Sequence, residues 1–240
     1  MAKQNKYILG ISVFNEGEKI LKVIERFRDY AVYDLLIMDD GTTDGSLERI
    51  PVNEHIFIVK NPQNRGAGHS VRNCLRWAKE RGYTALFLVA GNDKDRPEDV
   101  VKLEKGMDDG FDLVQGSRYL PGGGFGNMPF YRTVATRLVH PLLFSLITGR
   151  RITDSTNGFR AVRLSILDDK RIDLDQEWLD RYELEPYLFY KVIKLGYKVK
   201  EVPVTKIYPA HAMGYTKMKP ITGWWSILRP LVYLGLGIKK

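Results

Sequence analysis

The chain has 240 residues, 44% hydrophobic and 28% charged, which is typical of one large globular domain or one domain with an appendage. A single cysteine excludes an internal disulfide framework and fits a reducing compartment. The net charge of +8 favours polyanionic partners such as nucleotide phosphates, anionic lipid or nucleic acid, although a generically basic surface explains it equally well. The first residues lead directly into a strand-like run, so we predict a cytoplasmic protein without a signal peptide.

Strand-like and helix-like segments alternate over the first half of the chain. We predict strands at 7–13, 35–38, 56–59, 84–89 and 111–115. Helical spacing of apolar residues between them is seen at Ile20, Val23, Ile24 and Phe27, and again at Val71, Cys74, Leu75 and Ala78. This alternation predicts an α/β fold with a mostly parallel sheet flanked by helices.

The second half is less regular. A glycine-rich loop is expected at 120–127, and an apolar segment at 138–148 is too short to span a bilayer. Strands are expected at 159–162 and 198–204, with a helix at 186–195. We assign 1–210 to the main domain and 211–240 to a C-terminal helical segment.

The stretch 220–238 contains one charge, Arg229, and is flanked by lysines. Its paired tryptophans, Trp224 and Trp225, suit a helix that lies on the surface of a membrane. Core packing, a contact between two subunits and a true membrane span are the alternatives, and Arg229 with Pro230 in mid-run opposes the span.

Polar motifs follow several of the predicted strands. The segment 12–16 could place Phe14 on a flat base and Glu16 on a base or ribose, or it could simply cap the next helix. In the run 39–45, Asp39 and Asp40 point to opposite faces, so one can meet a ligand while the other supports the loop. Because carboxyl ends of parallel strands line the crevice where such sheets bind ligands, these motifs are expected to lie together.

Two further motifs suit phosphate. The turn 64–68 opens a helix and could present N–H groups to an anion, or it could serve tight packing. Arg118, in the run 116–119, could clamp a phosphate or be an ordinary surface arginine. Together the four motifs have residue types that suit a nucleotide diphosphate.

In order and spacing these motifs resemble the family 2 glycosyltransferases of the GT-A fold, closest to the polyprenyl-phosphate mannosyl- and glucosyltransferases. The resemblance covers about residues 7–205. The matching segments are Ser12-Val13-Phe14-Asn15-Glu16, Asp39 to Gly45, Asn64-Arg65-Gly66, Gly116-Ser117-Arg118-Tyr119, Asp154 to Arg160 and Glu201 to Val204.

The resemblance implies transfer, with inversion, from GDP-mannose, UDP-glucose or UDP-GlcNAc to a polyprenyl phosphate or another membrane-associated acceptor. The residues that would hold the nucleotide sugar are Ser12, Phe14, Glu16, Asp39, Asp40, Arg65, Gly66, Asn92 and Arg118. Asp154 would lie near the acceptor, and Glu185 is a candidate base. Arg132, Arg137 and Lys217 would hold the acceptor phosphate.

The chain departs from the family at its metal-binding Asp-x-Asp motif. Alignment on Pro97-Glu98 sets Ala90-Gly91-Asn92 against that motif. Asn92, Asp93 and Asp95 are the candidate ligands for Mg²⁺ or Mn²⁺, because both ions prefer oxygen donors. Asp93 would thus be needed for catalysis.

Two other functions fit parts of the sequence. Loss of the Asp-x-Asp motif leaves open a protein that binds nucleotide sugars without catalysis. Nucleic-acid binding rests on net charge alone and is opposed by the acidic crevice. The four histidines show no zinc-ligand spacing. Peripheral contact with the cytoplasmic face of a membrane, and a homodimer, are the expected associations.

Overall fold

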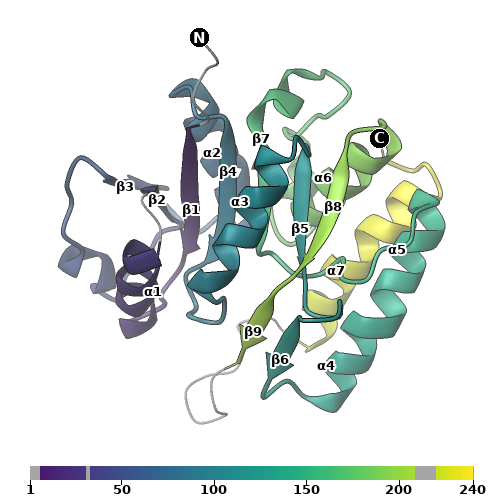
Figure 1. The fold of residues 1–240 in the computed structure, drawn as a ribbon, viewed down its shortest axis with the longest axis horizontal. Coiled ribbons are helices and arrows are strands. Elements are labelled where there is room, and N and C mark those ends of the chain that lie inside the picture. Colours follow the sequence, from purple (N-terminus) through teal and green to yellow (C-terminus); the bar gives the residue numbers. More distant parts are fainter. Residues whose placement is uncertain (1–5, 31–32, 209–219, 240) are drawn as a thin grey trace.

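A seven-stranded sheet forms the centre of the molecule, in the order β3-β2-β1-β4-β7-β5-β8 (Figure 1). The computed structural model describes residues 6–30, 33–208 and 220–239. The strands are β1 Tyr7–Val13, β2 Asp34–Asp39, β3 Ile56–Lys60, β4 Ala85–Ala90, β5 Leu113–Ser117, β7 Arg160–Arg163 and β8 Val199–Pro203. All neighbours pair in parallel except β7, which runs antiparallel to both β4 and β5. The mostly parallel sheet predicted from the sequence is therefore confirmed.

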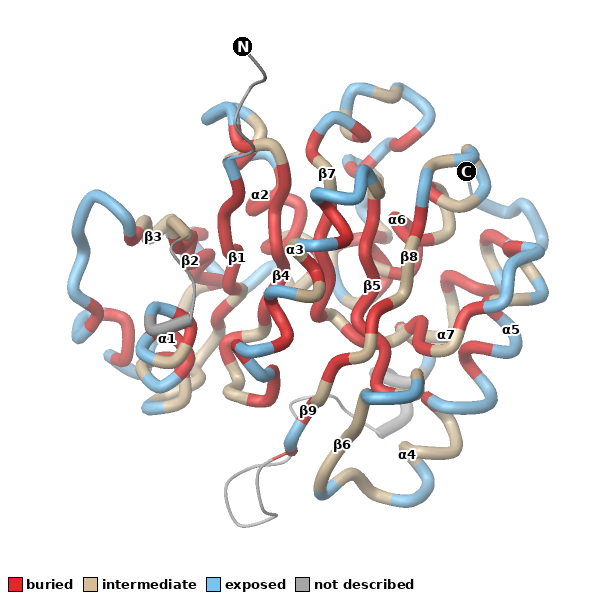
Figure 2. Tube along the Cα trace, in the orientation of Figure 1, coloured by how far each residue is buried: buried red, intermediate tan, exposed pale blue. Residues whose placement is uncertain are grey.

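Helices cover both faces of this sheet (Figure 1). They are α1 Glu18–Tyr30, α2 Ala67–Glu80, α3 Val100–Asp108, α4 Phe130–Val134, α5 His140–Thr148, α6 Leu184–Lys194 and α7 Pro220–Gly235. The face with α1 and α3 buries Ile20, Phe27 and Leu103 against the sheet. The opposite face, with α2 and α6, buries Cys74 and Leu188. Because strand side chains alternate, residues of β1 contribute to both cores. The central strands are accordingly buried along most of their length (Figure 2).

The glycine-rich segment differs from the predicted loop. Within it, β6 Gly124–Gly126 pairs in parallel with β9 Thr205–Ile207 below the carboxyl ends of β5 and β8. Glycine is needed here because a Cβ atom on Gly123 would lie 2.6 Å from the carbonyl oxygen of Ser117. Close backbone approach, rather than loop chemistry, explains this cluster of glycines.

A long helical run links the sheet to the C-terminal helix. The α4 helix continues through a π-helical segment, Ala135–Val139, into α5, so the predicted apolar segment begins earlier than expected. Helix α7 packs on α5 and α6, and its Leu231 and Leu234 are buried in the core. No described helix is long and apolar enough to cross a membrane. The boundary at 210/211 falls outside the described residues and stays a prediction.

Three polar contacts anchor α7. Glu183 is fully buried and lies 2.5 Å from both Arg229 Nη2 and the Ser226 hydroxyl. His140 Nε2 lies 3.2 Å from the carbonyl oxygen of Ile227, and its Nδ1 lies 2.7 Å from Ser155 Oγ. Arg229, the single charge of the stretch 220–238, therefore faces the protein. For this face of α7 the structure agrees with the core-packing alternative.

Candidate functional site

The carboxyl ends of β1, β2, β4 and β5 meet at one edge of the sheet, the lower edge in Figure 1. Because β7 is antiparallel, its beginning lies at the same edge and brings the segment 154–159 there. Most of the predicted site motifs are thus gathered along this edge by the topology alone.

The adjacent carboxylates Asp39 and Asp40 have different surroundings. Asp40 accepts hydrogen bonds from the backbone N–H groups of Arg65 and Gly66, at 2.9 and 2.8 Å, and from Asn61 Nδ2 at 3.1 Å. It therefore supports the loop before α2. The Asp39 carboxylate accepts a hydrogen bond from Thr42 N at 2.7 Å and lines a pocket. The two carboxylates have different surroundings because successive side chains at the end of β2 point to opposite faces of the sheet.

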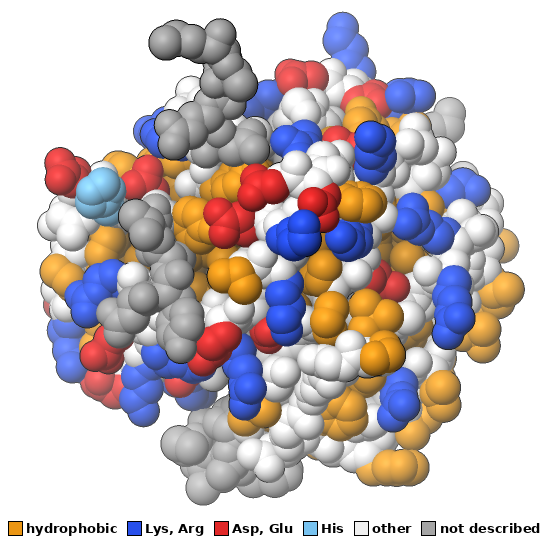
Figure 3. Space-filling view, viewed as in Figure 1, with side chains coloured by type: hydrophobic (Ala, Val, Ile, Leu, Met, Phe, Trp, Pro, Cys, Tyr) orange, Lys and Arg blue, Asp and Glu red, His pale blue; other side chains and the backbone are white. Residues whose placement is uncertain are grey.

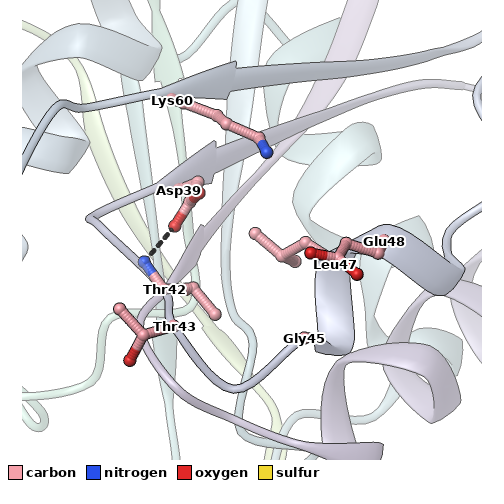
Figure 4. Close-up of a pocket in the computed structure, with 7 residues that line it drawn as sticks. All are labelled: Asp39, Thr42, Thr43, Gly45, Leu47, Glu48 and Lys60. Carbon is pink, nitrogen blue, oxygen red and sulfur yellow. Dashed lines mark hydrogen bonds between the residues drawn. The ribbon is translucent and has the colours of Figure 1, made fainter.

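The Asp39 pocket is formed by residues from two strand ends and the following turn (Figure 4). Its lining residues are Asp39, Thr42, Thr43, Gly45, Leu47, Glu48 and Lys60. The Lys60 side chain extends from the end of β3 over the pocket, opposite Leu47 and Glu48 (Figure 4). A carboxylate acceptor and an ammonium donor at the ends of two neighbouring strands suit a flat heterocycle that carries both N–H and C=O groups.

The loop after β1 is fastened to the wall of this pocket. Asn15 N donates to Thr42 Oγ1 at 3.3 Å, and Asn15 Oδ1 accepts from Thr43 N at 2.8 Å. Gly17 N also donates to Asp44 at 2.9 Å. The segments 12–16 and 39–45 are consequently joined side by side. Ser12, Phe14 and Glu16 are all partly exposed along it.

The turn before α2 is used for packing. The amides of Arg65 and Gly66 bind Asp40, and His69 N donates to the carbonyl oxygen of Asp180 at 2.9 Å. A Cβ atom on Gly68 would lie 2.0 Å from the carbonyl oxygen of Leu179. The packing alternative accounts for this turn, and the half-exposed side chain of Arg65 lies with its Nη2 3.7 Å from Asp180 Oδ2.

Arg118 and Asp154 form a fully buried pair. Arg118 Nε lies 2.7 Å from Asp154 Oδ2, and Nη2 lies 2.9 Å from Oδ1. The same guanidinium donates to Thr156 Oγ1 and to the Tyr208 hydroxyl, at 2.7 and 3.1 Å. Burial by itself raises the pKa of Asp154, but the charge and hydrogen bonds of Arg118 outweigh it and hold the pKa below its ordinary value. Asp154 is thus a weak base, and the pair serves to position the segment 154–158.

Glu185 and Glu201 complete the acidic side chains near this pair. Glu185, at the start of α6, is partly exposed and lies 3.6 Å from Arg160 Nε. Glu201 accepts hydrogen bonds from the N–H groups of Thr153 and Asp154, and burial raises its pKa. Glu185 is therefore the more accessible of the two carboxylates, whereas Glu201 holds the backbone that carries Asp154.

The loop after β4 holds the three predicted metal ligands, and their side chains are directed to different partners. Asp93 forms an ion pair with Arg26. Asp95 is buried and lies 2.5 Å from Lys206 Nζ. Asn92 Oδ1 is buried and has no hydrogen-bond partner among the described residues.

A divalent ion of this class needs several oxygen ligands, normally including an available carboxylate. Here both carboxylates are already neutralised by a cation, and only a neutral amide oxygen is left over. Within the described ranges, no group of three His, Cys, Asp or Glu side chains could hold a metal ion. The donor set of this loop does not fit Mg²⁺ or Mn²⁺.

Lys94, between the two aspartates, is buried at the same edge. Its Nζ lies 4.9 Å from the centroid of the Tyr208 ring, and Arg132 Cζ lies 5.3 Å from the same centroid. Burial, with the charges of Lys206 and Arg132, lowers the pKa of Lys94 to about 8, so the ammonium is still mostly protonated at neutral pH. The three cations come from different elements: the β4 loop, β9 and α4.

The remaining predicted acceptor ligands are less informative. Arg137 is exposed on the π-helical segment, with Cζ 5.9 Å from the Tyr119 ring. Lys217 lies outside the described residues.

Comparison with known proteins fits this geometry. The sequence profile of glycosyl transferase family 2 matches residues 9–171. The chain belongs to glycosyl transferase family 2. This family 2 glycosyltransferase is 28% identical over 214 residues to polyprenol monophosphomannose synthase of Mycolicibacterium smegmatis, covering 87% of this chain and 79% of the relative. It is 29% identical over 213 residues to undecaprenyl-phosphate mannosyltransferase of Micrococcus luteus, covering 87% and 85%. The resemblance stated from the motifs is confirmed.

Solved structures support the fold. Glucosyl-3-phosphoglycerate synthase from Mycobacterium tuberculosis, in complex with Mn²⁺, uridine diphosphate and glucosyl-3-phosphoglycerate, gives a TM-score of 0.66 with 15% identity. The match covers 97% of this glycosyltransferase and 79% of that chain. At this identity the likeness shows a shared fold, and the Mn²⁺ belongs to the other protein.

Sequence reasoning about this glycosyltransferase missed the buried cations Lys94 and Lys206. Lys94 stands within an acidic run, Asn92 to Asp95, so it reads as part of a solvated loop. Lys206 lies on a short strand whose pairing with the glycine-rich segment was not predicted. No signal in the sequence marks this pairing, because the burial of Asp95 beside Lys206 is a product of the fold.

Proposed function

We propose that this glycosyltransferase transfers a hexose, with inversion, from a nucleotide sugar to a polyprenyl phosphate. GDP-mannose is the first donor to test, because two relatives are named as polyprenyl-phosphate mannosyl enzymes. The observation that carries the proposal is the Asp39 pocket, which lies at the strand-end edge shared with the buried cations. A base in that pocket would direct its diphosphate along this edge, toward the ends of β1 and β4.

The chemistry requires one displacement at the anomeric carbon. An oxygen of the acceptor phosphate forms the new bond to this carbon while the bond to the diphosphate oxygen breaks, and the electron pair leaves with the nucleoside diphosphate. An ionised phosphate needs no base, which agrees with the weak basicity of Asp154. With a hydroxyl acceptor, the accessible carboxylate of Glu185 would be the proton acceptor.

A lipid acceptor needs a membrane surface, and one face of the molecule suits it. We define the α4–α5 apolar face by its exposed residues Phe130, Tyr131, Leu138, Val139, Leu142, Leu143 and Leu146. Figure 3 shows hydrophobic side chains gathered over α4 and α5. Arg137, Arg150 and Arg151 are exposed in the same part of the chain. Apolar side chains with nearby arginines support peripheral contact with an anionic membrane, for which we propose the cytoplasmic face.

This location refines the expectation for the C-terminal stretch. Trp225 and Val232 of α7 are exposed, so its outer face could join the same surface, whereas Arg229 faces inward. The membrane contact would then be made mainly by α4 and α5, with α7 as their support.

The test is sugar transfer by the purified protein. GDP-mannose, UDP-glucose and UDP-GlcNAc would each be incubated with undecaprenyl phosphate in vesicles, in parallel with EDTA, Mg²⁺ and Mn²⁺. We expect a glycolipid product from one donor. Absence of both transfer and donor hydrolysis in every combination would refute the proposed function.

A further inference from the structure

The strand-end edge carries positive charge where its acidic loop predicted a metal. Asp93 and Asp95 are paired with Arg26 and Lys206, so neither carboxylate is left to bind a cation. The backbone of Lys94 is fixed by a hydrogen bond from Ile207 N to its carbonyl oxygen, at 2.9 Å. The β4 loop and β9 are thus joined to each other at the backbone of Lys94.

The surroundings of Lys94 favour an added anion. Lys94 Nζ and Arg132 Cζ lie 4.9 and 5.3 Å from the centroid of the same ring, that of Tyr208, so two cations are gathered around one side chain. Burying a cation among like charges is costly, and a bound anion removes that cost. A second cation carrying two charges would increase the repulsion. The edge is therefore suited to a diphosphate and unsuited to Mg²⁺ or Mn²⁺.

The Tyr208 ring organises this charge. Lys94 and Arg132 both lie within cation–π distance of the ring, and its hydroxyl accepts a hydrogen bond from Arg118. The Arg118–Asp154 pair is internally neutral, so it adds no net charge beside this ring. Arg132 Nε is buried with no hydrogen-bond partner in the described part of the chain.

We propose that Lys94 and Arg132, with Lys206 behind them, neutralise the diphosphate of the donor and replace a divalent ion in this glycosyltransferase. The inference rests on the proposed function, because it takes a nucleotide sugar as the ligand. When the anomeric bond breaks, the leaving diphosphate gains negative charge, and fixed cations stabilise that charge without reorganisation.

The experiment measures binding of GDP and UDP, and of guanosine and uridine, by calorimetry in EDTA-treated buffer. We expect one diphosphate to bind with an affinity that Mg²⁺ or Mn²⁺ changes by less than about threefold. Lys94→Met should lower this affinity by about tenfold or more, because a charge-assisted contact is lost, and leave the matching nucleoside within about threefold. Lys94→Arg should retain most of it.

Two further variants complete the design. Arg132→Met, at a partly exposed helical position, should also lower the affinity for the diphosphate. This variant keeps the test decisive if Lys94→Met does not fold. Lys105→Met removes an exposed lysine of α3 and should leave binding unchanged. Nucleoside binding combined with diphosphate binding that requires Mn²⁺ or Mg²⁺ would overturn the inference alone. Binding of neither nucleosides nor diphosphates, with or without metal, would overturn the proposed function as well.

Discussion

The buried histidine of α5 predicts that the protein loses stability well above the pH at which carboxylates titrate. His140 is 1% exposed, and its imidazole joins Ser155 to the carbonyl oxygen of Ile227 on α7. Burial lowers its pKa to about 4, although the hydrogen bond to Ile227 and the charge of Asp154 act in the opposite direction. The neutral ring is therefore the form that the folded protein favours.

The sign and size of the effect follow from linkage. The unfolded chain binds the proton near the ordinary value of 6.5, whereas the folded chain binds it near 4. The stability that the neutral His140 contributes is thus fully present above pH 6.5 and is lost as the pH falls toward 4. The full loss is about 3 kcal/mol, of which about 2 kcal/mol is already lost at about pH 5.

Urea unfolding between about pH 7.5 and about pH 5 measures this loss. In His140→Gln the pH dependence in this window should be much smaller than in the wild type. His69→Gln is the control, because burial lowers the pKa of His69 in the same direction but that side chain is more exposed. An unchanged pH profile in His140→Gln, in a variant that still folds, would refute the reasoning.

Three other predictions follow from the described contacts. Glu183→Gln removes the charge that binds Arg229 and Ser226 and should lower the unfolding free energy by about 2–3 kcal/mol. This loss is smaller than for a wholly buried pair, because Arg229 is partly exposed. The double variant Glu183→Gln/Arg229→Met should recover part of the loss in urea titrations, and no recovery would contradict the pairing. Asp39→Asn should weaken nucleoside binding about tenfold with little change in stability. Asp40→Asn should lower the unfolding free energy by about 1–3 kcal/mol, because three loop hydrogen bonds depend on the Asp40 carboxylate. Equal effects of the two substitutions would argue against separate roles for the two aspartates. Leu142→Glu/Leu146→Glu should reduce sedimentation with anionic vesicles by about tenfold, and Val101→Glu on α3 should not; binding that survives the double change would exclude the α4–α5 apolar face.

The fold was predictable because its signals are local and repeated. Apolar runs identified the strands β1, β2 and β4 within one or two residues, because these strands are buried on both faces. Apolar residues at helical spacing identified α1 and α2, because each of these helices buries one face. Side-chain alternation at the end of β2 also anticipated that one of two adjacent aspartates would support the loop. The pairing of β6 with β9 was not predicted, because a run of glycines that allows close backbone approach has the same sequence pattern as a glycine-rich loop.

The electrostatics of the site depend on contacts between distant residues. Nothing in the sequence near Asp154 indicates that Arg118 saturates its carboxylate and makes it a weak base. Likewise, Asp95 reads as a metal ligand until Lys206, more than a hundred residues later, is placed 2.5 Å away. Motif matching identifies which positions reach the edge of the sheet, whereas the pairing of their charges decides what each of them can bind.

Cys74, packed on α2 against the sheet, provides a built-in reporter of opening motions. Its side chain is inaccessible, and burial raises the pKa of the thiol to about 12, so a maleimide reagent cannot attack it in the closed fold. Since the sequence contains no second cysteine, every labelling event would record a moment when α2 lifts from the sheet. Labelling rates with and without nucleotide would therefore show whether a ligand in the Asp39 pocket holds that layer in place, with no engineered probe.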